Sequence, residues 1–288
     1  MVWQVIAPVP GGGSGRSIAA IRIATQARWH PRCLPVHPLG MSTQPPADPE
    51  VPGAPENSCT HDDNTGPRLL YAVRHGQSTI NAGVRPATPA EADDMVIELT
   101  DLGKRQAAAL GRWAAALPPE QFPDIVLCSP YRRAVQTWQL AEAELRAAGV
   151  ALPCRVTDPR LYDRFRGTLA HIPVSEVRER YPEQYAAEQA DPLGYRPPGG
   201  ESFHDVAARM TGVLDRIAAD TRHRRVLIVA HDAVILLLRR LLEHLDDTGT
   251  LAVAAQGLAG NASVTAWAWE AGDYRLLCYD RREHLPPP

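Results

Sequence analysis

The chain is nearly without lysine: Lys104 is the only one among its 30 lysine and arginine residues. With 33 acidic residues the formal net charge is -3, which gives no bulk attraction to nucleic acid or to an anionic membrane. We therefore expect neither as a partner. Local cationic sites can still be built from arginine, whose planar guanidinium matches the oxygens of a phosphate group.

The sequence also lacks paired cysteine spacings and long apolar runs. Its five cysteines are an odd number, and no two stand in a CxxC spacing, so neither a disulfide framework nor a zinc site is expected. No apolar run reaches the ~18–20 residues that span a bilayer. The longest, between residues 226 and 238, is interrupted by His231 and Asp232. A cytoplasmic location fits these absences best.

Acidic residues are absent before Asp48, in a segment whose composition differs from the rest. Residues 1–66 are rich in proline, glycine and serine, and they offer too little apolar surface to offset the entropy of ordering. We predict disorder for most of this leader and a single domain over residues 67–288. Arginines without acidic residues can indicate an organelle transit peptide. A dispensable leader, with Met41 as an alternative start, is the interpretation we favour.

From Pro67 onward, short apolar runs alternate with segments of helical periodicity. Strands are predicted at residues 69–73, 124–128, 155–157 and 226–230, with a closing hairpin at 263–269 and 274–279. Helices are predicted after Thr100, at residues 131–148, near 174–189, after Ser202 and at 233–245. Apolar strands that are each followed by a helix imply a mainly parallel sheet covered on both faces, a three-layer α/β/α sandwich.

Polar side chains follow three of these strands, at the point where each strand ends. Arg74 and His75 follow the first, the stretch Ser129–Arg133 follows the second, and His231 follows the fourth. In open α/β sheets ligands bind beyond the carboxyl ends of the strands, where helix N-termini add positive dipole ends. A histidine or an arginine at one such position is often merely structural or solvated. Their convergence at one edge predicts a phosphate-binding site.

Six segments, in order, resemble the histidine phosphatase superfamily, also called phosphoglycerate mutase-like. The tripeptide Arg74-His75-Gly76 resembles its RHG signature, and the resemblance spans roughly Leu69 to the hairpin near Tyr279. These segments are residues 74–81 (RHGQSTIN), 98–107 (ELTDLGKRQA), 129–137 (SPYRRAVQT), 161–167 (LYDRFRG), 198–202 (PGGES) and 229–231 (VAH).

The resemblance implies a role for each of six residues. His75 would be the nucleophile, and Arg74, Asn81, Arg133 and His231 would bind the phosphoryl oxygens. The family's register selects Arg133 over its neighbour Arg132, which we expect at the surface or at the substrate rim. Phosphohistidine chemistry requires no metal, so neither a metal nor another cofactor is predicted.

Asp163 would be the general acid and base, although many members of the family have glutamate at this place. The alternative interpretation is that Asp163 is an ordinary ion-pair partner of Arg164 or Arg166. Asp232 follows His231 where glycine is common, and we expect its carboxylate to turn away from the phosphate. Asp94 belongs to an acidic stretch with Glu91 and Asp93, which we interpret as a solvated loop.

Three functions stay open, each involving a small phosphorylated ligand. We favour a phosphomonoester hydrolase over a mutase, because the glycolytic mutases have an Arg-Arg pair after the acid. This chain has Arg178 and Arg180 in the corresponding segment but no adjacent Arg-Arg pair and no lysine. A non-catalytic phosphate-binding module is the third possibility. Substrate specificity is expected to come from residues 171–196, and the sequence does not indicate the oligomeric state.

Overall fold

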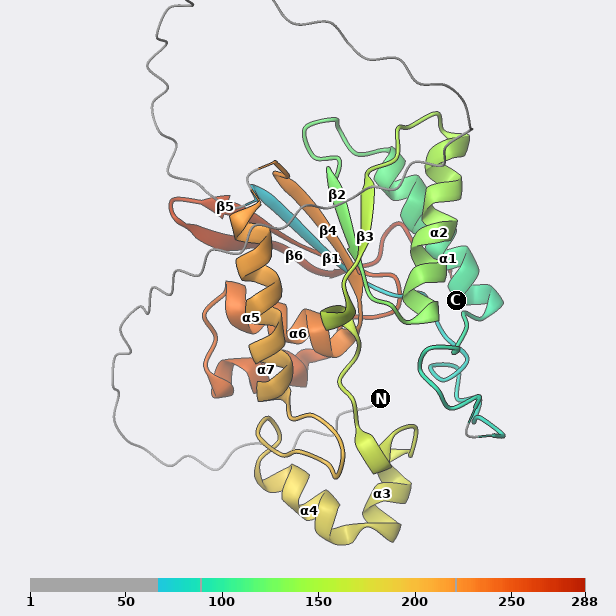
Figure 1. Ribbon diagram of the computed structural model, residues 1–288, viewed down its shortest axis with the longest axis vertical. Helices are drawn as coiled ribbons and strands as arrows, with labels where there is room; N and C mark the ends of the chain where they lie inside the picture. The colour runs from blue at the N-terminus through green and yellow to red at the C-terminus, as the bar shows by residue number, and fades with distance from the viewer. Residues whose placement is uncertain (1–66, 89, 221, 288) are drawn as a thin grey trace, which may run out of the picture. The chain divides into compact units, whose positions relative to one another are not determined.

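The computed structural model describes residues 67–88, 90–220 and 222–287 (Figure 1). The predicted disorder of residues 1–66 lies outside this range. No helix in the described part of the chain is long and apolar enough to cross a membrane.

Six strands form one sheet in the order β3-β2-β4-β1-β5-β6. They are β1 (Leu69–Arg74), β2 (Ile125–Cys128), β3 (Cys154–Thr157), β4 (Arg225–Ala230), β5 (Val264–Glu270) and β6 (Asp273–Arg281). The first four pair in parallel, and β5 and β6 add an antiparallel hairpin beside β1. The residues of β2, and all but the outermost of β1 and β4, are buried, as a sheet covered on both faces requires. The predicted, mainly parallel sheet is confirmed.

Helices cover both faces of the sheet (Figure 1). On one face α1 (Asp101–Ala115) and α2 (Arg132–Ala147) pack Leu110 and Trp138 against Tyr71 and Val73 of β1. On the other face, side chains of α5 (Phe203–Ala219), α6 (Asp232–Leu242) and α7 (Asp247–Gln256) pack against the alternate residues of the same strands. Successive side chains of a strand point to opposite faces, so each strand contributes to two cores.

Local capping explains where several helices begin. The Thr100 hydroxyl accepts a hydrogen bond from the amide of Gly103 at 3.1 Å. Ser202 and Asp205 form the reciprocal capping box that opens α5. Each cap satisfies amides that lack a partner in the first helical turn, which stabilises the helix by about 1 kcal/mol. Both starts agree with the sequence prediction.

Two helical predictions were wrong. The helix expected near residues 174–189 is divided into α3 (Val174–Arg180) and α4 (Pro182–Ala190). Pro182 has no amide hydrogen and disfavours helical geometry at the residue before it, and Tyr181 accordingly adopts φ -132° and ψ 56°. The helix expected at 233–245 ends at Leu242, and α7, which was not predicted, follows an Asp246 cap. Short 3₁₀ turns at Pro159–Leu161 and Gly167–Leu169 complete the elements.

Two glycines allow the segment after β1 to lie directly against the first turn of α1. A β carbon on Gly103 would lie 2.0 Å from the Gln77 carbonyl oxygen, and one on Gly76 would lie 2.5 Å from the Gly103 carbonyl oxygen. Neither contact is sterically allowed, so both positions require glycine while the backbone keeps this path. The path determines where His75 lies.

We predict that Gly103→Ala lowers the free energy of unfolding by about 1–3 kcal/mol, because the methyl group would overlap main-chain atoms that cannot move independently. Gly212→Ala in α5 is the matched control. Its β carbon would meet only the tip of the Arg160 side chain, at 3.4 Å, so we expect equal or higher stability. Urea denaturation followed by circular dichroism measures both, and equal effects of the two substitutions would contradict the steric argument.

Candidate active site

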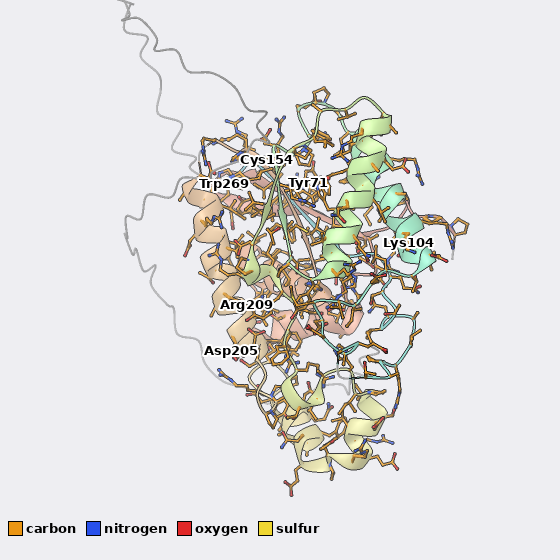
Figure 2. The ribbon with its side chains drawn as sticks, turned by 45° about the vertical axis from the view of Figure 1, so that its right-hand side comes forward. Tyr71, Lys104, Cys154, Asp205, Arg209 and Trp269 are labelled. Carbon is orange, nitrogen blue, oxygen red and sulfur yellow. The ribbon has the colours of Figure 1, made fainter. Side chains whose placement is uncertain are left out.

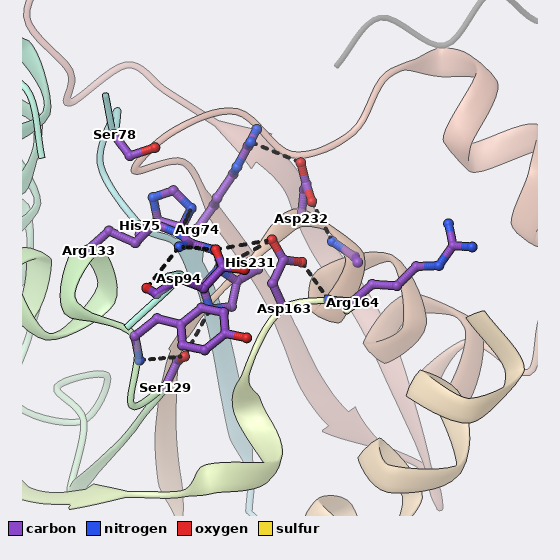
Figure 3. A network of polar contacts seen from close by, with 12 residues as sticks. Arg74, His75, Ser78, Asp94, Ser129, Arg133, Asp163, Arg164, His231 and Asp232 are labelled. Carbon is purple, nitrogen blue, oxygen red and sulfur yellow. Dashed lines mark hydrogen bonds and ion pairs between the residues drawn. The ribbon is translucent and has the colours of Figure 1, made fainter. Parts of the chain in front are cut away.

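The carboxyl ends of β1, β4 and β2 bring two imidazoles and two guanidiniums together (Figure 3). His75 follows β1, and His231 follows the neighbouring strand β4 as the N-cap of α6. Their ring centroids are 5.1 Å apart. Arg133, in the first turn of α2, places its Nε 3.2 Å from the His75 Nε2. Arg132, the neighbour that the family register did not select, is exposed and pairs with Glu98.

His75 is 2% exposed, and its hydrogen bonds determine its tautomer. Its Nδ1 lies 2.7 Å from the Gly76 carbonyl oxygen, which can only accept, so Nδ1 carries the proton and Nε2 keeps a lone pair. Burial, followed by the positive charges of Arg133 and Arg74, holds the His75 pKa well below its usual value. The ring is therefore neutral near pH 7, as a nitrogen nucleophile must be.

Thr137 connects the two halves of the site. Its hydroxyl donates to the Arg133 carbonyl oxygen one helical turn earlier, at 2.6 Å, and accepts from the Gly76 amide at 3.0 Å. The loop that carries His75 is thus hydrogen-bonded to the helix turn that carries Arg133. The family segment around Thr137 was identified from the sequence, but this positioning role was not.

His231 is fully buried and is held by a residue to which the sequence analysis gave no role. The Ser129 hydroxyl lies 2.9 Å from its Nε2 and also accepts from the Tyr131 amide. The His231 Nδ1 lies 3.5 Å from Arg133 Nη2 and faces the centre of the site. Burial, then the charge of Arg133, lowers the His231 pKa well below its usual value, so this ring is also neutral.

Arg74 is bound by a carboxylate that we expected to point elsewhere. Its Nη2 lies 2.9 Å from Asp232 Oδ2, and its Nη1 donates to the Ala259 carbonyl oxygen. The expectation that the Asp232 side chain turns away from the site was wrong. A guanidinium with only 14% of its side-chain surface exposed needs a nearby counter-charge, and Asp232 is in reach at the N-terminus of α6.

Asp163 lies beside the same cluster. Its Oδ2 is 3.5 Å from Arg133 Nη2 and 3.7 Å from His231 Nδ1, while its Oδ1 accepts from the Arg164 amide. Burial and the nearby negative charge of Asp232 raise the Asp163 pKa to about 7, against the opposing effect of Arg133. A carboxyl group with this pKa can both donate and accept a proton near neutral pH.

The alternative role for Asp163, as ion-pair partner of a neighbouring arginine, does not hold, because the side chains of Arg164 and Arg166 both pair with Glu188. Arg209, which lies one turn beyond Asp205 on α5 (Figure 2), instead holds the backbone of this stretch. It donates to the carbonyl oxygen of Asp163 at 3.2 Å and to the Glu201 carboxylate at 3.0 Å. Sequence analysis missed Arg209, since nothing in its helical context distinguishes it.

Asp94 was interpreted as part of a solvated loop, and that interpretation was wrong. Its Oδ1 lies 2.7 Å from Arg133 Nη1, and its Oδ2 lies 3.9 Å from His171 Nε2. Only Asp93 and Glu91 of that acidic stretch are exposed. A pairing between a loop residue and a helix residue 39 positions away leaves no local sequence signal.

Asn81 lies at the edge of the cluster. Its side-chain oxygen accepts from the Ser78 hydroxyl at 3.1 Å and from the Asn261 amide at 3.0 Å, and Asn261 also donates to the His75 carbonyl oxygen. Five of the six residues singled out from the sequence thus lie around one centre, and Asn81 reaches it only through Asn261. Its contact with phosphate stays a prediction.

A neutral, buried histidine beside two arginines at the carboxyl edge of such a sheet is an arrangement suited to an anionic ligand. The chain belongs to the histidine phosphatase superfamily (branch 1), whose family model matches residues 70–281.

Curated relatives with two different activities match the chain at the same sequence identity. It is 32% identical, over 67% of its length and 85% of the relative's, to a 2,3-bisphosphoglycerate-dependent phosphoglycerate mutase of Methylorubrum populi. It is also 32% identical to a metal-independent phosphoserine phosphatase of Arabidopsis thaliana, over 58% of this chain and 65% of that protein. Among solved structures, a mycobacterial glucosyl-3-phosphoglycerate phosphatase complexed with VO3 aligns at 27% identity, covering 75% of this chain and 100% of that one, with a TM-score of 0.58.

We predict that Asp163→Asn changes stability in a pH-dependent way. The folded-state pKa of about 7 lies above the usual 3.8, so the folded protein binds this proton more tightly than the unfolded chain does. Asp163 therefore destabilises the fold increasingly as pH rises from about 4 through 7. At pH 8 the variant should be more stable than the parent by up to about 4 kcal/mol, and near pH 4 the two should be nearly equal.

Urea denaturation at both pH values tests this, and Asp215→Asn, which removes one exposed carboxylate of α5, controls for net charge. A stability difference that is the same at pH 4 and pH 8 would show that Asp163 titrates normally.

Proposed function

We propose that this protein hydrolyses phosphomonoesters through a phosphohistidine on His75, with Asp163 as general acid and then general base. The observation that carries the proposal is the state of His75. Its Nδ1 proton is committed to the Gly76 carbonyl oxygen, so the Nε2 lone pair faces a cluster of cationic and titratable groups.

In the first step the His75 Nε2 forms a bond to phosphorus as the ester P–O bond breaks. The proton of the Asp163 carboxyl passes to the leaving oxygen, so the alcohol departs neutral. Arg74, Arg133 and His231 donate to the phosphoryl oxygens, where negative charge is concentrated in the transition state. Their fixed positions around His75 support this assignment.

In the second step Asp163, now ionised, accepts a proton from water as the water oxygen attacks phosphorus. The N–P bond breaks, phosphate leaves, and both His75 and Asp163 return to their starting states. A pKa near 7 suits a group that must lose and regain a proton in each cycle. No step requires a metal ion.

Hydrolysis is favoured over mutase activity by the segment after Asp163. Arg180 pairs with Glu176 of the same helix and is 60% exposed, and Arg178 is exposed as well. Neither supplies the adjacent arginine pair that grips the carboxylate in the glycolytic mutases. A non-catalytic module is disfavoured because a purely binding site has no use for a carboxyl group whose pKa is raised to about 7.

His75→Ala should abolish both turnover and an acid-labile phosphoenzyme, with a loss of activity of more than about a thousandfold. We expect the parent protein, given 3-phosphoglycerate or aryl phosphates, to release inorganic phosphate without forming an isomerised product. Rapid quench with ³²P-labelled substrate measures the phosphoenzyme, and His244→Ala, at a 72% exposed histidine, is the control. Efficient isomerisation, or turnover that survives His75→Ala, would overturn the proposal.

Asp163→Asn should slow esters with poor leaving groups far more than esters with good ones. An alkyl phosphate needs the proton from Asp163, and its hydrolysis should fall by about 100–10,000-fold, whereas p-nitrophenyl phosphate should lose much less in the first step. In the parent, kcat/KM for the alkyl ester should fall as pH rises through about 7, because the required protonated form disappears, and the variant should lack this limb. Equal losses for both esters would exclude Asp163 as the acid.

A further inference from the structure

The guanidinium of Arg133 has no side left open for a phosphate in this structure. Its Nε donates to His75 Nε2, its Nη2 lies 3.5 Å from both Asp163 and His231, and its Nη1 is held by Asp94 at 2.7 Å. The Asp94 contact is the shortest of these. A phosphoryl group on His75 must therefore take over donors that carboxylates now occupy.

Arg133 itself is poorly able to move. Its side chain is 6% exposed, its guanidinium carbon lies 4.7 Å from the centre of the Tyr131 ring, and its helix turn is tied to the Gly76 loop through Thr137. Stacking on an aromatic ring and a fixed helix turn restrict rotation of the guanidinium. A phosphate that binds Arg133 must therefore displace the Asp94 carboxylate.

Asp94 is the less constrained partner of this pair by position. It lies in the irregular segment between β1 and α1, followed by the exposed side chains of Met95 and Val96. Its side chain is 20% exposed, and its second oxygen already faces His171. A carboxylate released from Arg133 can therefore turn toward His171, and it stays beside the site.

We propose that Asp94 is a specificity-determining residue: it is the resident counter-ion of Arg133 that the substrate phosphate displaces, and it then disfavours negatively charged leaving groups. Only the second part of this inference, the selection against negatively charged leaving groups, rests on the proposed function. Two guanidiniums, Arg74 and Arg133, meet three carboxylates here, those of Asp94, Asp163 and Asp232. Even with Asp163 protonated, the charges of Asp94 and Asp232 balance those of the two guanidiniums, so the site has no surplus of positive charge, and like charges close together are repelled strongly where screening is weak.

The preferred substrates are accordingly phosphomonoesters whose leaving group is neutral or cationic. An ester that carries a carboxylate close to its phosphate, such as a phosphoglycerate, would bring a second negative charge beside the displaced Asp94. The exposed apolar side chains of Met95 and Val96 next to Asp94 offer no compensating cation.

Calorimetric titration with inorganic phosphate tests the displacement without any need for turnover. Asp94→Asn removes the competing charge but keeps the size of the side chain, and we expect it to bind phosphate about fivefold more tightly. Asp93→Asn is the matched control, since Asp93 is exposed and accepts only from the Met95 amide. Its phosphate affinity should match that of the parent. Unchanged affinity in Asp94→Asn, or the same gain in Asp93→Asn, would overturn the proposal.

Competition between two substrates tests the selectivity. The ratio of kcat/KM for 3-phosphoglycerate to that for phenyl phosphate should rise about fivefold in Asp94→Asn and stay at the parent value in Asp94→Glu, which restores the charge. An unchanged ratio in Asp94→Asn would show that Asp94 does not select the leaving group. If the parent protein hydrolyses neither ester, the proposed function fails, while the phosphate titration still decides whether Asp94 competes for Arg133.

Discussion

The site depends on keeping two arginines charged in a place where water has little access. Arg74 and Arg133 have 14% and 6% of their side-chain surface exposed, and a guanidinium cannot escape the cost of burial by losing its proton. Carboxylates must therefore lie close by, and three of them do. Burial, reinforced by the same positive charges, lowers the pKa of both imidazoles, and burial, reinforced by the charge of Asp232, raises the pKa of Asp163. The properties on which the proposed nucleophile, acid and anion site depend thus follow from one arrangement of buried charges.

The parts of this arrangement that could be predicted from the sequence are those with local signals. Buried strands appear as continuous apolar runs, and polar residues directly after β1, β2 and β4 predict a shared edge, because parallel strands end on the same side. Thr100 and Ser202 indicate helix starts through their capping hydrogen bonds. The family segments then selected Arg133 rather than Arg132, and these two residues are respectively buried at the centre and exposed.

What could not be predicted depends on contacts between distant segments. The contact of Asp94 with Arg133 and that of Arg209 with the Asp163 backbone join residues 39 and 46 positions apart. The orientation of the Asp232 side chain was predicted from its repulsion by phosphate alone. The buried Arg74 guanidinium also needs a counter-charge, and Asp232 provides it. Two local signals were overlooked: Pro182 stands in the sequence at the break between α3 and α4, and Asp246 is a capping residue directly before α7.

The position of β1 within the sheet has a consequence for how the proposed activity can diversify. β1 and β4 are neighbouring inner strands, hydrogen-bonded on both sides, and the two histidines directly follow them. Asp94 and Asp163 instead belong to irregular segments between elements. Substitutions that change the preferred ester can therefore accumulate in the connecting segments with little loss of folding stability, while the strands that position the proposed nucleophile tolerate few substitutions. Substrate preference can thus change while the proposed reaction is kept.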